Sequence, residues 1–364
     1  MPHRYQRSMS YAIARERFLE ACHAANSELH RLRLCDFSSN KKLDPELFID
    51  ITILYPEKKV SSCLVISSGL HGVEGFAGSE VQRRFIDFLS HAKHRLAETK
   101  LVMIHAVNPY GFKYLRRWNE DGIDLNRNFL LDEESYQGSP DKYAELFRFI
   151  NPSRPPQKID RFWLEAPYQI SKHGFSTMTN VIATGQYDFP DGLFFGGQAP
   201  SASMIAISQH IDQWIDANIP TLHLDLHTGL GRWGELSFFL EALDPQNDLH
   251  DVQKIFLNRT IRTEKNSAFL AQGLFGRWLL HRYFPLKYRF LTLEFGTFGM
   301  IGLFKILRSE HQAYRYLPED HPDQIYWRQR LLDYFSPATE SWWRSIVPQG
   351  VEACWQALIG LQNN

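Results

Sequence analysis

The sequence contains few cysteines, no long apolar run and no excess of charge of either sign. Its four cysteines, at positions 22, 35, 63 and 354, include no close pair such as Cys-x-x-Cys. Reduced thiols in a cytoplasmic protein are the simplest interpretation. No apolar run reaches the roughly 18 residues that a membrane span requires, and residues 1–7 lack the apolar core of a signal peptide. We therefore expect a cytoplasmic protein with no membrane partner.

Acidic and basic residues are balanced, since 40 Lys and Arg accompany 41 Asp and Glu and the net charge is -1. A surface of this kind does not favour nucleic acid as a partner. Hydrophobic residues make up 44% of the 364 positions, which is enough for a large core. The sequence shows no internal repeat, low-complexity segment or flexible linker. We expect one compact domain that spans residues 1–364.

Strand-like and helix-like patterns alternate along most of the chain, which is typical of an α/β fold. Apolar runs predict strands at residues 47–55, 60–67, 101–104, 179–183, 219–226, 236–240 and 289–295. Helical spacing of apolar residues predicts helices at residues 10–22, 73–89, 143–150, 204–215, 252–261 and 274–283, and in much of the chain after 304. The first two strands lie close enough to form a hairpin, and residues 60–104 predict a strand, a crossover helix and a strand. The whole predicts helices around a mixed sheet.

The first candidate site lies in the turn at residues 67–75, Ser-Ser-Gly-Leu-His-Gly-Val-Glu-Gly. Its three glycines break the preceding strand and permit a tight turn. His71 and Glu74 therefore follow the carboxyl end of a strand, where open α/β sheets place their ligand sites. An imidazole and a carboxylate three residues apart can converge on one cation, and zinc accepts both ligand types. The alternative is a chance pattern, because such short motifs are common.

Two later strands also carry candidate residues. His223, Asp225 and His227 would point to one face of a strand, but the two histidines are about 13 Å apart along it and cannot both bind one zinc. The strand ends at Thr228-Gly229, which places His227 nearer the functional rim. Core histidines are the alternative for both, and we favour it for His223. Glu294 ends the apolar run 289–295, where its burial without a partner would be costly. The alternative there is a salt-bridged glutamate at a strand end.

These pieces stand in one order with two further motifs between them: His71-x-x-Glu74, Asn108-Pro109-Tyr110-Gly111, Asp124-Leu125-Asn126-Arg127-Asn128-Phe129, His227 and Glu294. The set resembles the zinc carboxypeptidase superfamily over roughly residues 45–300. It is most similar to a poorly characterised bacterial branch near the succinylglutamate desuccinylase and aspartoacylase enzymes. The resemblance implies an α/β fold with a mixed, mostly parallel, twisted sheet and helices on both faces. It also implies a single catalytic domain with an insert around residues 130–200 and a helical C-terminal segment.

The resemblance implies zinc as cofactor, with His71, Glu74 and His227 as its ligands. Asp124 matches the residue that orients the first histidine, and Glu294 matches the catalytic glutamate. Two histidines and one glutamate leave the fourth zinc position open, as a catalytic site requires. A water there would ionise near neutral pH, and Glu294 could take its proton and return it to the leaving nitrogen.

The resemblance also implies a substrate with a free carboxylate, held by Asn126 and Arg127. An arginine before them polarises the scissile carbonyl, for which Arg117 fits best and Arg116 is the alternate. A planar guanidinium suits both tasks. Surface salt bridges are the alternative interpretation of all three arginines.

The expected function is that of a zinc-dependent hydrolase of amide bonds next to a free carboxylate, in first place a metallocarboxypeptidase. Its substrate would be a peptide or an N-acyl amino acid, and an N-acyl-amino-acid deacylase is the alternative. A metal- or peptide-binding protein with degenerate catalysis is an alternative of another class. A serine hydrolase is disfavoured, because no Gly-x-Ser-x-Gly motif follows a strand.

Two features leave questions open. Digestive members of the superfamily carry a tyrosine that caps the substrate. Tyr283 and Tyr288 lie in the corresponding interval but match no motif, so this role is unassigned. The segment 185–197 is rich in glycine and aromatic residues, and it could form either a loop over the rim of the site or a structural turn.

Overall fold

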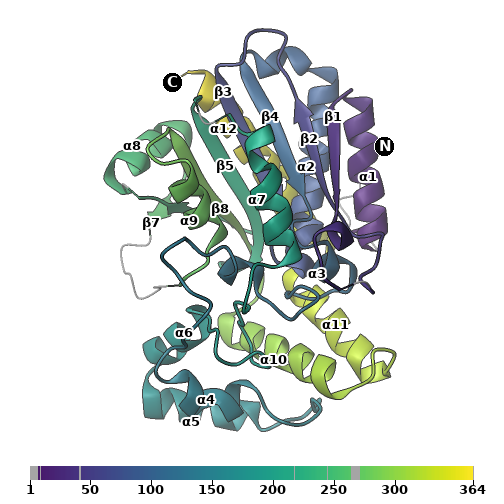
Figure 1. Ribbon diagram of the computed structural model, residues 1–364, viewed down its shortest axis with the longest axis vertical. Helices are drawn as coiled ribbons and strands as arrows, with labels where there is room; N and C mark the ends of the chain where they lie inside the picture. The colour runs from purple at the N-terminus through teal and green to yellow at the C-terminus, as the bar shows by residue number, and fades with distance from the viewer. Residues whose placement is uncertain are drawn as a thin grey trace.

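A computed structural model describes residues 7, 8, 10–40, 42–216, 218–243, 245–263 and 271–363. Its centre is an eight-stranded sheet in the order β1-β2-β4-β3-β5-β8-β6-β7 (Figure 1). The strands are β1 (Glu28–Arg33), β2 (Phe48–Leu54), β3 (Ser62–Ser68), β4 (Thr99–His105), β5 (Thr221–Gly229), β6 (Leu236–Glu241), β7 (Ile261–Thr263) and β8 (Tyr288–Gly296). The pairs β3-β4, β3-β5, β5-β8 and β6-β7 are parallel, whereas β1-β2, β2-β4 and β6-β8 are antiparallel. The predicted mixed, mostly parallel sheet is confirmed.

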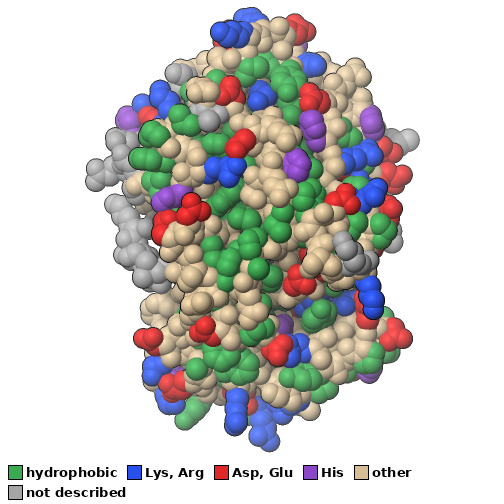
Figure 2. Space-filling model, viewed as in Figure 1, with side chains coloured by type: hydrophobic (Ala, Val, Ile, Leu, Met, Phe, Trp, Pro, Cys, Tyr) green, Lys and Arg blue, Asp and Glu red, His purple; other side chains and the backbone are tan. Residues whose placement is uncertain are grey.

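The helices surround this sheet on both faces and at one end. They are α1 (Tyr11–Ala24), α2 (Gly75–His91), α3 (Pro109–Lys113), α4 (Tyr143–Ile150), α5 (Phe162–His173), α6 (Phe175–Ala183), α7 (Ala202–Trp214), α8 (Pro245–Ile255), α9 (Phe275–Arg282), α10 (Met300–Tyr316), α11 (Pro322–Phe335) and α12 (Glu340–Gln362). Among the described residues, no helix has the length and the apolarity that crossing a bilayer requires. Acidic and basic side chains lie interspersed over the face seen in Figure 2, in line with the small net charge.

The central strands pack against helices on both sides. In β3, Leu64 and Ile66 belong to the core that α1, α2 and α12 cover, whereas Cys63 and Val65 belong to the core under α7 and α9. A parallel strand with both faces buried needs apolar residues at nearly every position, and β3 is buried throughout. The continuous apolar run that predicted this strand therefore reflects its central place in the sheet.

The predicted hairpin of the first two strands is wrong. β4 lies between β2 and β3, antiparallel to the first and parallel to the second. The crossover helix α2 carries the chain from β3 back to the start of β4, so the helix rather than the short β2–β3 link decides which strands are neighbours. β1, which the sequence pattern did not predict, pairs with β2 at the edge of the sheet.

The predicted strand at 179–183 is also wrong, because these residues end helix α6. β-branched residues gave the strand signal. In the fold, Phe175, Met178, Thr179 and Ile182 lie along one helical face and line a cavity, so tertiary packing overrides local propensity.

The helices α4, α5 and α6 lie with α10 and α11 beyond one end of the sheet, at the bottom of Figure 1. Arg308 on α10 ties this layer together by donating from Nε to the carbonyl of Phe149 on α4 (2.7 Å). α4–α6 fall within the predicted insert around 130–200, and α10–α12 make up most of the chain after Glu294. That all these parts form one catalytic domain stays a prediction.

Candidate metal centre

The loop that carries His71 and Glu74 is held against the start of α3. A Cβ atom at Gly72 would lie 2.0 Å from the carbonyl carbon of Gly111, so only glycine permits this close approach. Asn108 caps α3 by accepting a hydrogen bond from Gly111 N (2.8 Å), and its amide donates to the carbonyl of Arg117 (3.2 Å). The Asn-Pro-Tyr-Gly motif therefore braces the loop.

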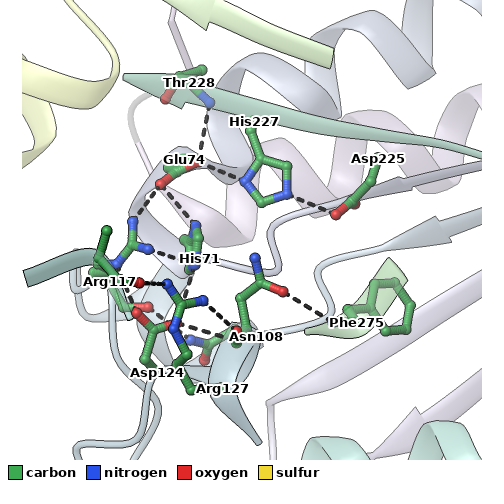
Figure 3. Close-up of polar contacts among 12 residues, drawn as sticks. His71, Glu74, Asn108, Arg117, Asp124, Arg127, Asp225, His227, Thr228 and Phe275 are labelled. Atoms are coloured by element: carbon green, nitrogen blue, oxygen red, sulfur yellow. Dashed lines mark hydrogen bonds and ion pairs between the residues drawn. The ribbon is translucent and has the colours of Figure 1, made fainter. Parts of the chain in front are cut away.

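The fold brings His71, Glu74 and His227 to one point, although they come from distant parts of the chain (Figure 3). All three side chains are buried, and one potential ligand atom of each lies within 4.8 Å of the others. Glu74 Oε1 is 3.0 Å from His71 Nδ1, and Glu74 Oε2 is 3.1 Å from His227 Nδ1. The parallel pairing of β3 with β5 brings the loop after β3 beside the end of β5.

The chemistry of this cluster fits a divalent cation. His71 Nδ1 is buried and forms no hydrogen bond within the described chain, which is costly unless a cation takes its lone pair. Burial raises the pKa of Glu74, but the two imidazoles outweigh burial and hold that pKa well below its usual value. Burial lowers the pKa of His227, but Asp225 and Glu74 outweigh it and raise that pKa. An ionised Glu74 and a His227 that readily takes up a second proton both indicate that the cluster accommodates an added positive charge. Two imidazoles with one carboxylate are a zinc donor set.

Asp124 and Arg117 enclose the outer side of His71 (Figure 3). Asp124 Oδ1 is 3.1 Å from His71 Nε2, and Arg117 donates from Nε to Asp124 Oδ2 (3.1 Å) and from Nη1 to Glu74 Oε1 (3.1 Å). Burial raises the pKa of Asp124, but Arg117 and His71 outweigh it, so the pKa lies well below its usual value. Asp124 is therefore an ionised carboxylate on the outer side of His71, and Arg117 Nη2 also lies 2.8 Å from His71 Nε2. A proton on Nε2 that is donated to Asp124 would leave the Nδ1 lone pair for a cation.

Glu294 stands beside the cluster because β5 and β8 are parallel neighbours in which His227 and Glu294 are register partners. Its side chain is buried, and Oε1 accepts a hydrogen bond from Leu230 N (2.8 Å). Burial and the nearby Glu74 raise the pKa of Glu294 to about 7, against the opposing effect of His227. A carboxyl group with a pKa close to neutrality can both accept and return a proton.

Asp225 holds the far side of His227, a role that the sequence analysis missed. Its Oδ2 lies 2.7 Å from His227 Nε2, and its Oδ1 accepts from Ser67 Oγ (2.5 Å). Ser67 Oγ lies 2.6 Å from His223 Nε2, and His223 Nδ1 lies 2.6 Å from the Tyr288 hydroxyl. The signal was present in the two-residue spacing of Asp225 and His227, which puts both side chains on one strand face.

The protonation states of these side chains decide which atom donates in each hydrogen bond. Burial lowers the pKa of His223 to about 4, so this histidine is neutral and carries one proton. Since Ser67 gives its proton to Asp225, His223 donates from Nε2 to Ser67 and accepts at Nδ1 from Tyr288. Each donor in this chain of hydrogen bonds then points toward the Asp225 carboxylate. Asp225 accepts the proton of His227 Nε2, which leaves His227 Nδ1 for a cation.

The two residues expected to hold a carboxylate are engaged within the protein. Arg127 donates to the carbonyls of Ala183 and Thr184 at the end of α6 and to the carbonyl of Asn126 in its own turn. Asn126 accepts from Phe275 N (3.0 Å). Both residues still line the cavity beside the cluster, so their role toward substrate stays a prediction.

Arg116, the alternate to Arg117, lies away from the cluster. It is fully buried, donates from Nε to Glu310 (2.7 Å) and stacks over the ring of Tyr314. Of the two arginines, Arg117 is the one that contacts His71 and Glu74.

The segment 185–197 makes most of its contacts with other parts of the protein and contributes little to the cavity. Gly185 lies against the Arg127 side chain, where a Cβ would come within 2.6 Å, and the Tyr187 hydroxyl donates to the carbonyl of Arg127 (2.8 Å). Phe194 is the member of this segment that lines the cavity. The two candidate capping tyrosines are turned away from it, since Tyr283 donates to Asp212 (2.9 Å) and Tyr288 bonds to His223.

Comparison with known families gives a match over nearly the whole chain. The family model described as "Protein of unknown function (DUF2817)" matches residues 7–349. The chain belongs to the DUF2817 family. A search of the curated proteins found no match.

Several solved structures of low sequence identity are similar to this DUF2817 chain. Bovine thrombin-activatable fibrinolysis inhibitor, in complex with tick carboxypeptidase inhibitor, is similar over 99% of both chains at 14% identity and a TM-score of 0.51. A metallo-carboxypeptidase from Burkholderia cenocepacia matches at 12% identity over 95% of this chain and 68% of that one, with a TM-score of 0.49. A protein assigned to the succinylglutamate desuccinylase / aspartoacylase family, from Shewanella amazonensis SB2B, matches at 15% identity over 79% and 71%, with a TM-score of 0.39. The similarity to the bovine structure confirms the predicted carboxypeptidase-like fold class.

The contact between Asp225 and His227 leads to a first prediction. Asp225→Asn replaces a double acceptor by an amide whose NH2 group faces either the Ser67 hydroxyl or the His227 N–H. We expect zinc affinity to fall about 10- to 100-fold, as is usual when a histidine ligand loses its outer carboxylate. Zinc titration against a competing chelator measures this. Asp216→Asn, an exposed change just before β5, is the matched control. Equal affinity of both variants would show that Asp225 does not position His227.

Proposed function

We propose that this DUF2817 protein is a zinc-dependent hydrolase of amide bonds next to a free carboxylate. The observation that carries the proposal is the meeting of His71 Nδ1, the Glu74 carboxylate and His227 Nδ1 at one buried point in the wall of a cavity, with Glu294 beside them. This arrangement supplies the metal ligands and an acid–base group in one place. The shared fold with carboxypeptidase-like structures is in line with it.

Bound at this point, zinc would act as a Lewis acid and make a water nucleophile available at neutral pH. The remaining tasks belong to the chain. Leu230 N holds Glu294 Oε1, which leaves Oε2 to take a proton and pass it to the leaving nitrogen. Arg117 lies at the cavity wall beside the ligands and is the residue placed to stabilise negative charge on the carbonyl oxygen. Asp124 would orient the ring of His71, and Asp225 would orient the ring of His227 and keep its proton on Nε2.

Two substrate forms have an amide next to a free carboxylate. One is the C-terminal bond of a peptide, which would make the protein a metallocarboxypeptidase. The other is an N-acyl amino acid. Arg127 and Asn126 are the proposed partners of the carboxylate in both.

A binding protein with degenerate catalysis is the candidate of another class. A protein that only binds a metal or a peptide would need no acid–base group beside its metal ligands. The buried Glu294 carboxyl, which lies beside His227 and is held by Leu230 N, supports the enzyme instead.

The proposal is tested with protein purified without chelator. We expect stoichiometric zinc, and hydrolysis of at least one member of a panel of peptides and N-acyl amino acids that stops when a chelator is added and resumes with zinc. Circular dichroism confirms that the sample is folded. A folded sample that contains no zinc and takes up none would remove the basis of the proposal.

A further inference from the structure

The metal cluster opens into a cavity of about 460 Å³ that extends far beyond it. Away from the cluster, one part of the wall comes from the predicted insert and from α10, and other parts come from β6, β8 and α11. We call this part the apolar lobe and define it by Ala166, Ile170, Met178, Ile182, Leu303 and Phe304. These residues lie on α5, α6 and α10, the helical layer at the end of the sheet. The lobe and the metal ligands share one continuous space.

The lobe offers a ligand little to hydrogen-bond. Thr179 turns its hydroxyl to the carbonyl of Phe175 (2.9 Å), and Thr292 donates to Glu241 (3.3 Å). Thr179, Thr292 and Glu241 are the polar side chains that line the cavity away from the cluster and its arginines, as far as the chain is described. Of these, only Thr179 lies on a helix of the lobe, because Thr292 is in β8 and Glu241 in β6. A peptide unit placed in the lobe would bury an N–H and a C=O without partners, which is unfavourable. The lobe therefore suits a group that carries no polar atoms.

The size of the cavity indicates how long that group is. A cavity of about 150 Å³ holds a benzene molecule, so the whole cavity of 460 Å³, which includes the space at the metal cluster, is roughly three times the space of one aromatic ring. One amino-acid side chain would leave much of it empty. The mouth is apolar as well, because Phe175, Leu230, Met300 and Ile301 line the cavity while each stays more than 40% exposed. A long aliphatic chain fills such a space and contacts such a rim.

Resting on the proposed function, we propose that the substrate is a fatty N-acyl amino acid, whose medium- or long-chain acyl group occupies the apolar lobe. The amide lies at the metal cluster and the carboxylate faces Arg127. Hydrolysis breaks the C–N bond with one water. The carbonyl carbon gains the hydroxyl and leaves as a fatty acid, and the nitrogen gains the proton and leaves as the amino acid.

The test is a series with one amino acid and acetyl, hexanoyl, decanoyl and tetradecanoyl groups. We expect kcat/KM to rise about fourfold for each added methylene, the effect of burying it in an apolar site, until the lobe is full. Binding is measured separately by calorimetry on the zinc-loaded Glu294→Gln protein, where affinity is expected to rise in the same way. A flat or falling series in both measurements would overturn the proposal.

Two matched variants on α5 test whether the acyl chain lies in the apolar lobe. Ala166→Trp fills the lobe, since Ala166 is buried in its wall, and is expected to lower the decanoyl-to-acetyl ratio of kcat/KM tenfold or more. Leu164→Trp adds the same side chain to the same helix at a position 77% exposed and is expected to leave that ratio unchanged. Equal ratios in both variants would place the acyl chain elsewhere.

The outcomes separate this inference from the proposed function. Hydrolysis of short substrates without a gain from chain length overturns the inference alone. Affinity that rises with chain length, in a zinc-loaded wild-type protein that hydrolyses neither these substrates nor peptides, overturns the proposed function and supports the lobe as an acyl site.

Discussion

Glu294→Gln is expected to lower kcat about 1,000-fold while the protein keeps its fold and its zinc. Glutamine has the shape of glutamate, and its carbonyl can still accept the hydrogen bond from Leu230 N. It cannot take a proton at neutral pH. General acid–base groups contribute about 10² to 10⁴ to a rate, and here one carboxylate would serve both proton transfers. Steady-state kinetics with metal analysis of the same sample measure the effect.

Glu340→Gln is the matched control, because Glu340 lies on the surface at the start of α12 and pairs only with Arg344 among the described contacts. Its kcat should equal that of the wild type. A Glu294→Gln protein with full zinc and an undiminished rate would contradict the acid–base role of Glu294.

The pH dependence of kcat/KM is an independent test of the role of Glu294. Glu294 must be ionised to act as a base, and burial with Glu74 raises its pKa to about 7 in the metal-free protein. A bound cation favours the carboxylate and moves this pKa down. We expect kcat/KM to rise with pH on the acid side, with the midpoint of the rise at or below about pH 7. The Glu294→Gln variant should lose this limb.

His227→Ala is expected to abolish zinc binding at micromolar metal and to reduce activity to that of the metal-free wild type. The change removes one of three ligands, so the loss of affinity should exceed the roughly 100-fold that follows from losing an outer partner. It also leaves Asp225 buried without its histidine, so thermal stability should fall. Metal analysis and calorimetric titration give the affinity, and circular dichroism verifies the fold.

His91→Ala provides the comparison. His91 is exposed at the far end of α2, about 25 Å along the helix from the metal loop. This variant should bind zinc and react as the wild type does. Full zinc occupancy in His227→Ala would mean that the metal, if bound, uses other ligands.

The roles of some site residues can be inferred from the sequence around them, whereas the roles of others depend on distant parts of the chain. His71 and Glu74 share one turn after a buried strand, so their proximity follows from three residues of spacing. Asp225 and His227 share a strand face for a similar reason, although only the structure shows the 2.7 Å contact between them. Arg116 and Arg117 are adjacent in sequence, yet one pairs with Glu310 in the core and the other with Glu74. Such a choice depends on partners from distant elements.

The sequence alone determined the α/β class, the buried central strands and the ordered set of motifs, because these depend on local periodicity and on residues a few positions apart. Only the tertiary structure decided that β4 lies between β2 and β3, that residues 179–183 are helical and that Arg127 is tied to the end of α6. It also created the apolar lobe from helices more than 100 residues apart in the chain. The physical reason is that strand order, cavity shape and the pairing of buried charges are set by long-range packing, which no short window of sequence encodes.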